Sequence, residues 1–284
     1  MNDNKHKIGI IGLGFVGGAI YEYFSPIVDT KVYDVNKKDV SVESLNDLLD
    51  NRILFLCLPT PMKITGECDI SVITSVLTDL NDICKHDDST IVIIKSTIPP
   101  GTTNSLIDKY PNLSICFNPE FLTEANFVED FKNQDRIILG SDDKDLLDKV
   151  HSLYEFGFPK TKIIHTNPVE AEMVKYVANT FLATKVSFAN EIHSICNFLN
   201  IDYNNVVEIA RIDKRLGDSH WQVPGPDGKK GFGGSCFPKD INALIHFCKK
   251  NNISIETITA AWESNLESRP EQDWKNLKGR AVSD

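Results

Sequence analysis

The sequence predicts an α/β fold, in which a doubly wound parallel sheet over residues 1–166 is followed by an α-helical domain over 167–284. Three observations predict this organisation. A glycine-rich turn joins the first apolar run to a helix-like segment. Further short apolar runs then alternate with helical patterns, as in sheets covered on both faces. Beyond residue 166 the strand-like runs stop, and one long central helix is predicted from 168 to 198.

The first apolar run, 7–11, leads into the pattern GxGxxG. In a strand–turn–helix context, Gly12 permits the tight turn, Gly14 lets a pyrophosphate approach, and Gly17 lets the helix pack on the strand. The phosphates then bind at the N-terminus of the following helix. This context predicts a Rossmann-type, dinucleotide-binding domain. Its candidate cofactor loop consists of Gly12, Gly14, Phe15, Val16 and Gly17.

The next strand-like run ends at Asp34, about twenty residues beyond the glycines, where an acid binds the ribose diol. A carboxylate repels a 2′-phosphate, which favours NAD over NADP as the cofactor. Lys37 and Lys38 lie nearby and weaken that preference. An accidental glycine turn is the weaker interpretation, because strand, spacing and acid occur together.

Strand-like runs recur at 53–58, 90–94, 114–117, 136–139 and 162–165, with helices predicted at 71–84, 102–109 and 144–156. In such sheets the ligand lies beyond the carboxyl ends of the strands. Thr60, Ser96, Thr97 and Glu120 all follow strand-like runs. Any one of them is as readily a turn or cap residue, but the four together favour a site.

In the long predicted helix, Glu172, Lys175 and Asn179 are three and four residues apart and share a face. A solvated, ion-paired face is the usual fate of such charges. Apolar neighbours around them indicate instead that the helix is buried over much of its circumference. A buried lysine beside an asparagine is suited to holding a substrate hydroxyl and a catalytic water.

A second glycine-rich stretch, 231–240, joins a loop to another predicted helix and contains Cys236. Pro238 suits the first helical position, so Cys236 should lie just before a helix N-terminus, with Lys239 three residues on. The helix dipole and the lysine both favour thiolate over thiol. Gly233 and its neighbour carry no Cβ, so another molecule can approach their backbone closely. A lone cysteine is more often buried and inert, but these neighbours predict a reactive nucleophile.

The composition limits the partners. Net charge is −10, which argues against nucleic acid or an anionic membrane as the main partner. Seven cysteines without CxxC or Cys/His clusters indicate reduced thiols, no metal site and a cytoplasmic location. We expect no signal peptide and no transmembrane helix.

Together these motifs resemble the UDP-glucose/GDP-mannose dehydrogenase family. The matching pieces follow the family's order along nearly the whole chain: GLGFVG (12–17), LPTP (58–61), KSTIPPGT (95–102), NPEFLTE (118–124), EAEMVKYVANT (170–180), DKRLG (213–217) and GFGGSCFPKD (231–240). The resemblance implies a four-electron oxidation of a nucleotide-sugar C6 alcohol to the acid with two NAD. UDP-glucose is the expected substrate.

The resemblance also implies residue roles. Cys236 is similar to the nucleophile that captures the aldehyde as a thiohemiacetal, which a second hydride transfer converts into a thioester. Lys175 and Asn179 resemble the groups that steady the C6 oxygen. Asp240 resembles the partner of the catalytic water, and Glu120 the base that aids thioester hydrolysis. The other implied contacts are Thr60, Thr97 and Glu124 with the cofactor, and Glu120, Phe121, Leu122, Lys175, Asn179, Arg215, Gly233 and Lys239 with the substrate.

Two expectations concern the assembly. Arg215 resembles the family arginine that reaches the substrate in an adjacent subunit, so a homodimer is expected. Family members usually carry a second, C-terminal Rossmann-type domain that binds much of the nucleotide, and this chain stops where that domain would begin. This leaves either a natural short form or a truncated chain. In a short form, Trp221 and Lys229 are candidates for part of the nucleotide contact.

Three alternatives stay open. GDP-mannose and UDP-N-acetylmannosamine dehydrogenases share these motifs. β-Hydroxyacid dehydrogenases have a similar two-domain plan with a lysine and an asparagine on the long helix, but they need no cysteine. A non-enzymatic NAD-binding remnant is the third, and the intact set of Lys175, Asn179, Cys236 and Asp240 argues against it.

Overall fold

The computed structural model describes residues 6–85 and 89–283. The chain forms two compact units. The first comprises the described residues up to Thr60 together with Ile70–Lys175, and the second comprises Pro61–Asp69 and the chain from Tyr176 onward. The predicted boundary at 166 precedes the long helix, whereas the two units divide within it.

The first unit is built on a seven-stranded sheet in the order β2-β1-β3-β4-β5-β6-β7. Five neighbouring strands are parallel, and β3 to β5 are buried nearly throughout, which explains their continuous apolar runs. The strands are β1 (Lys7–Ile11), β2 (Asp29–Tyr33), β3 (Ile53–Leu56), β4 (Ile91–Ile94), β5 (Ser114–Phe117), β6 (Arg136–Gly140) and β7 (Lys162–Thr166). The predicted α/β class is confirmed.

The last two strands depart from a wholly parallel sheet. β6 meets β5 in antiparallel fashion at the pair Phe117 and Gly140, and β7 follows β6 in parallel. A parallel neighbour needs a crossover element that lies along the sheet. The helix between β5 and β6, α4 (Phe127–Lys132), has only six residues and packs beside α1, where the Phe15 and Phe127 rings meet edge-on at 5.2 Å. The sequence did not predict α4.

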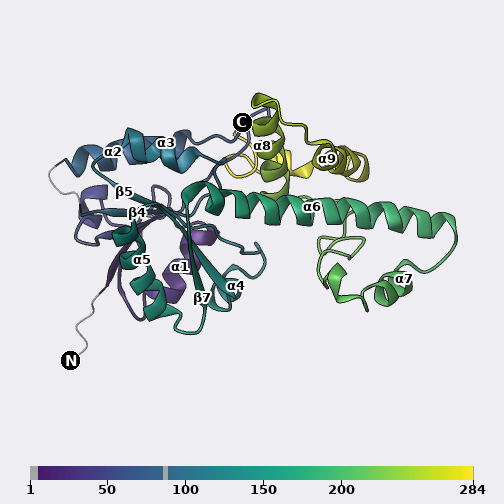
Figure 1. The fold of residues 1–284 in the computed structure, drawn as a ribbon, viewed down its shortest axis with the longest axis horizontal. Helices are drawn as coiled ribbons and strands as arrows, with labels where there is room; N and C mark the ends of the chain where they lie inside the picture. Colours follow the sequence, from purple (N-terminus) through teal and green to yellow (C-terminus); the bar gives the residue numbers. More distant parts are fainter. Residues whose placement is uncertain (1–5, 86–88, 284) are drawn as a thin grey trace. The chain divides into compact units, whose positions relative to one another are not determined.

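Helices cover both faces of the sheet, as Figure 1 shows. α1, α4 and α5 pack on one face, and α2, α3 and the start of α6 pack on the other. Their bounds are α1 (Phe15–Phe24), α2 (Ser71–Ile83), α3 (Thr102–Lys109) and α5 (Lys144–Gly157), with a short 3₁₀ turn, η1, at Leu45–Leu48. The carboxyl ends of β1, β3, β4 and β5 therefore open at one edge of a fully covered sheet, where α/β proteins bind ligands.

The second unit is organised on α6 (Pro168–Phe198), whose residues beyond Lys175 belong to it. In Figure 1, α8 and α9 lie on one side of α6 and α7 on the other. Ala183, Phe232 and Ile241 are buried together where α6 meets α8 and α9. The elements are α7 (Tyr203–Ala210), α8 (Cys236–Lys250), α9 (Glu256–Ser268), η2 (Lys214–Leu216) and η3 (Asp273–Asn276).

The C-terminal segment stays within this second unit. The Ala281 carbonyl accepts a hydrogen bond from Met62 N at 2.9 Å, and Ser283 N donates to the Met62 carbonyl at 3.0 Å. Trp274 and Ala281 are buried beside Met62. Among the described residues, none of the helices combines the length and apolar character that crossing a bilayer requires.

Candidate functional site

The glycine loop of the first unit has the geometry of a phosphate-binding turn. Gly12 has a φ of +90°, and a Cβ there would come within 2.6 Å of the Cys57 carbonyl oxygen. A Cβ on Gly17 would lie 1.9 Å from the Gly12 oxygen, so both positions require glycine. Gly14, by contrast, faces open space, and no side chain caps α1 there. These residues fit a dinucleotide, because a helix begins at the point where a pyrophosphate would lie, and the dipole of a helix N-terminus favours negative charge.

Asp34 follows β2, and its carboxylate holds the glycine loop. Its Oδ2 accepts a hydrogen bond from Leu13 N at 2.6 Å, and its Oδ1 accepts from Asn36 N at 2.8 Å and Lys37 N at 3.2 Å. The carboxylate is thus fixed by backbone donors before any ligand binds. This task, anchoring the loop, was not predicted from the sequence.

The other polar residues at strand ends are ordered and mostly buried. Thr60 and Thr97 are both buried, and Ser96 Oγ donates to the Leu58 carbonyl at 2.6 Å. Glu124 is exposed, four residues beyond Glu120. The parallel strands β3, β4 and β5 thus bring Thr60, Thr97 and Glu120 to the same edge of the sheet.

Lys175 and Glu120 form a buried ion pair in the first unit. Lys175 Nζ donates to Glu120 Oε1 at 2.9 Å and to the Glu120 carbonyl at 2.7 Å. Leu122 N donates to the other carboxylate oxygen at 2.7 Å. Burial raises the pKa of Glu120, but the Lys175 ammonium and these hydrogen bonds outweigh burial, and the pKa lies below its ordinary value. Glu120 is therefore ionised at neutral pH. The Phe121 ring lies 5.5 Å from Lys175 Nζ.

A second buried lysine, which was not predicted as a site residue, lies next to this pair. Lys95 Nζ donates to Asn118 Oδ1 at 2.5 Å, and the Tyr154 hydroxyl donates to the same oxygen. Asn118 Nδ2 donates to the Ile138 carbonyl at 2.7 Å, which fixes the amide. Lys95 and Glu120 both line a cavity of about 380 Å³. The sequence signals for Lys95 were its place directly after an apolar run, which also marks an ordinary strand end, and its place as the first residue of the motif KSTIPPGT.

The second unit gathers four of the predicted residues around the start of α8. Asn179 Nδ2 donates to Asp240 Oδ2 at 2.5 Å, and Lys239 Nζ donates to Asp240 Oδ1 at 2.5 Å. Cys236 is the first residue of α8, one helical turn before Asp240, so the two share a face. Helix α8 thus begins two residues earlier than Pro238 had indicated.

The charges of this cluster favour a cation beside the thiol. Burial lowers the pKa of Lys239, but the negative charges of Asp240 and Cys236 outweigh burial and raise the pKa above its ordinary value. Asp240 is only 1% exposed, so both its carboxylate oxygens depend on Lys239 and Asn179. Lys239 therefore keeps its proton, and its charge lies close to Cys236.

The remaining predicted residues fall outside both clusters. Arg215 is exposed on η2 and pairs with Asp213 through two guanidinium nitrogens. Gly234, with φ at +70°, faces open space, whereas a Cβ on Gly233 would lie 2.5 Å from the Arg269 guanidinium. Gly233 is therefore glycine because of a neighbour within the chain. Lys229 pairs with Asp273 at 2.8 Å, so its charge is already partly neutralised.

Comparisons with known proteins match most of the chain to one family. Residues 46–156 match the model of the NAD binding domain of the UDP-glucose/GDP-mannose dehydrogenase family, and residues 169–267 match its central domain. UDP-glucose 6-dehydrogenase of Rickettsia bellii is 35% identical over 257 residues, which are 85% of this chain and 57% of the relative. UDP-glucose 6-dehydrogenase AglM of Haloferax volcanii is 30% identical, over 96% of this chain and 72% of the relative.

A solved structure is similar over the same region. The UDP-glucose dehydrogenase from the hyperthermophilic archaeon Pyrobaculum islandicum superimposes with a TM-score of 0.84 at 27% identity, covering 95% of this chain and 70% of that one. The chain thus spans between 57% and 72% of the length of these three proteins. The match to the NAD binding domain confirms NAD as the cofactor. The chain belongs to the UDP-glucose/GDP-mannose dehydrogenase family.

Proposed function

We propose that this protein oxidises the C6 alcohol of a nucleotide sugar to the carboxylic acid with NAD, and that the sugar is UDP-glucose. Two relatives and one solved structure, each named as acting on UDP-glucose, support the substrate. The balanced reaction takes one alcohol, two NAD and one water to one carboxylate and two NADH, with release of protons.

The observation that carries the proposal is the cluster of Cys236, Lys239, Asp240 and Asn179. A single alcohol oxidation needs no thiol, so a cysteine on a helix start beside a persistent cation indicates a covalent step. The helix N-terminus and the Lys239 ammonium both stabilise negative charge on sulfur. Holding the aldehyde as a thiohemiacetal on Cys236 keeps a reactive intermediate bound between the two oxidations.

Lys175, Asn179 and Cys236 have separate roles in the two oxidations. The glycine loop Gly12–Gly17 and Asp34 would hold NAD, which would supply the hydride acceptor for each of the two oxidations. Lys175 donates a hydrogen bond to the C6 oxygen and stabilises negative charge there, and the Asn179 amide donates to the same oxygen. After the first oxidation, the Cys236 sulfur adds to the aldehyde carbon, and the second oxidation leaves a thioester.

Hydrolysis of the thioester needs an activated water. Glu120, ionised at neutral pH, is suited to take a proton from that water, while Asp240 orients it. The water oxygen bonds to the acyl carbon, the carbon–sulfur bond breaks, and sulfur leaves as thiolate beside Lys239. Thr97 and Glu124 are proposed to line the nicotinamide.

The test is NADH release from limiting UDP-glucose by the wild type and by Cys236→Ser. Two NADH per sugar are expected from the wild type and at most one from the variant, because a serine hydroxyl does not form the thioester. Cys248→Ser, which changes a buried cysteine further along α8, is the matched control and should still give two.

Separate reactions with GDP-mannose and UDP-N-acetylmannosamine identify the substrate. A faster reaction with either would overturn the assignment of UDP-glucose and keep the four-electron chemistry. One NADH per sugar from the wild type would contradict the covalent mechanism. No NADH from any of the three sugars would overturn the proposed activity.

A further inference from the structure

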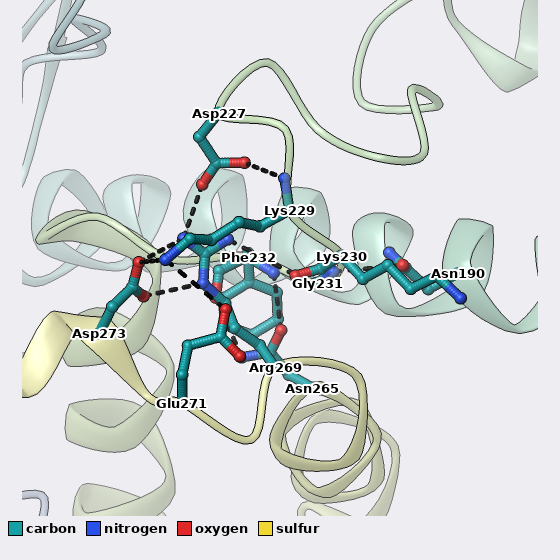
Figure 2. Close-up of polar contacts among 10 residues, drawn as sticks. All are labelled: Asn190, Asp227, Lys229, Lys230, Gly231, Phe232, Asn265, Arg269, Glu271 and Asp273. Atoms are coloured by element: carbon teal, nitrogen blue, oxygen red, sulfur yellow. Dashed lines mark hydrogen bonds and ion pairs between the residues drawn. The ribbon is translucent and has the colours of Figure 1, made fainter.

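The loop that leads to Cys236 lies across two side chains of the α9 region, Asn265 and Arg269. Figure 2 shows the loop passing over Asn265 and the Arg269 guanidinium. Asn265 is fully buried, with Oδ1 accepting from Phe232 N at 2.7 Å and Nδ2 donating to the Phe232 carbonyl at 3.1 Å. One amide thus satisfies both backbone groups of a single loop residue. On the other side, Asn190 Oδ1 accepts from Gly231 N at 3.2 Å.

Arg269 is held by carboxylates from two segments. Its Nε and Nη2 donate to the two oxygens of Asp273 at 2.8 and 2.7 Å, and Nη2 also donates to Asp227 Oδ2 at 2.6 Å. These contacts hold the pKa of Asp273 well below its usual range. Asp227 belongs to the loop, so the guanidinium ties the loop to the residues after α9. Arg269 is 2% exposed, which makes this a desolvated, charge-assisted contact.

Asn265 and Arg269 explain why two positions of the loop are glycine. A Cβ on Gly231 would lie 2.4 Å from Asn265 Oδ1, and a Cβ on Gly233 would lie 2.5 Å from the guanidinium. The backbone therefore rests directly on both side chains. Three residues after Gly233 the chain reaches Cys236, where α8 begins. Because this connection is short, Asn265 and Arg269 can determine where the Cys236 sulfur lies.

We propose that Arg269, together with Asn265, is a positioning residue for Cys236. The proposal rests on the proposed function, because Cys236 is the group being placed. Arg269 acts through the loop backbone and does not itself act on the substrate. Lysine cannot replace it, since one ammonium lacks the planar fork that joins Asp227 and Asp273 at once.

The first experiment measures NADH yield and steady-state kinetics for Arg269→Ala. We expect kcat for formation of the carboxylic acid to fall about 100-fold with KM within about twofold, since a displacement of about 1 Å at a reacting group has such an effect. The NADH yield should fall from two per sugar toward one, with free aldehyde in solution, because the alcohol oxidation does not need the thiol. Guanidinium ion added to this variant should restore kcat and the yield.

Two further variants and a control complete the design. Asp227→Asn removes the charge of one of the two carboxylates that Arg269 contacts. Because Asp227 is half-exposed, this variant should fold normally and lower kcat by a smaller factor than Arg269→Ala. Arg269→Lys should resemble Arg269→Ala. Arg211→Ala, which removes an arginine paired with the exposed Asp218, should keep both kcat and the yield of two.

Backbone hydrogen exchange at Phe232 gives a readout that does not depend on activity. Its N–H, bonded to Asn265, should exchange faster in Arg269→Ala and return to the wild-type rate with guanidinium. Unchanged exchange, or an unchanged yield of two NADH, in a folded Arg269→Ala protein would overturn the positioning role. A wild type that makes no NADH would instead overturn the proposed activity.

Discussion

At the scale of single residues, Lys95 carries an ammonium group into the core of the first unit. Its side chain is 3% exposed, and burial lowers its pKa to about 8, although Cys57 and Glu120 raise it. The unfolded chain, with an ordinary lysine, binds more protons than the folded protein between pH 8 and 10. The free energy of unfolding contributed by Lys95 therefore rises with pH in this window.

Lys95→Met should accordingly stabilise the protein at pH 7, by about 2 kcal/mol after the lost hydrogen bond to Asn118 is deducted. Tyr154 still donates to the Asn118 oxygen in the variant. Urea unfolding at pH 7, 8 and 9 is the measurement, and the wild type should recover about 1 kcal/mol relative to the variant between pH 8 and 9. Above pH 9 the Cys57 and Cys116 thiols, whose pKa desolvation raises to about 12, oppose this trend. An equal effect in Lys162→Met, an exposed lysine of the same unit, would contradict the argument.

At the scale of elements, Glu172 ties α6 to the start of α3. Its two carboxylate oxygens accept from Gly101 N at 2.6 Å and Thr103 N at 2.7 Å, and the Thr103 hydroxyl donates to one of them. These are N–H groups of a helix start that no side chain of α3 itself satisfies. The carboxylate also complements the dipole of α3.

Glu172→Gln should lower the free energy of unfolding by about 1–3 kcal/mol, because its amide NH₂ faces a backbone donor and leaves one buried N–H without an acceptor. Chemical denaturation of the folded protein is the measurement. Glu208→Gln, on the exposed side of α7, is the matched control and should change little. Equal stability of the two variants would mean that the cap contributes nothing.

The elements also show what the sequence could and could not predict. Strand-like runs located all seven strands of the sheet, and helical spacing located α6 over its whole length. α4 was missed because its six residues are too few for a periodic pattern. The antiparallel pairing of β6 with β5 is a tertiary arrangement that no local pattern encodes.

Some residues of the candidate site could be predicted from the sequence and others could not. Cys236, Lys175 and Asn179 were predicted because each lies in a local pattern of residue types with chemical meaning. Lys95 and Arg269 were not, since their contacts join segments far apart in the chain. Gly233 was predicted to leave space for a ligand, and the space is taken by Arg269. Tertiary packing, rather than composition, decides such positions.

At the scale of the whole molecule, α6 presents a row of exposed apolar side chains. Phe181, Phe188 and Ile195 follow one another at intervals of seven and are 66%, 50% and 52% exposed. Val177 and Phe198, which are also exposed, complete a seam with the spacing of a helix–helix interface. Exposed apolar rows of this length are typical of surfaces that another protein covers.

We expect this seam, defined by Val177, Phe181, Phe188, Ile195 and Phe198, to form the interface of a homodimer. Size-exclusion chromatography with light scattering should give a dimer for the wild type. The double change Phe181→Asp and Phe188→Asp should give a folded monomer, because two carboxylates would be buried without partners. Ile64→Asp, at a fully exposed isoleucine outside the seam, should stay dimeric. A wild-type monomer at tens of micromolar, or a dimeric double variant, would contradict the interface.

Because Arg215 is expected to reach the substrate of the adjacent subunit, the monomeric variant should also lose NADH production with UDP-glucose.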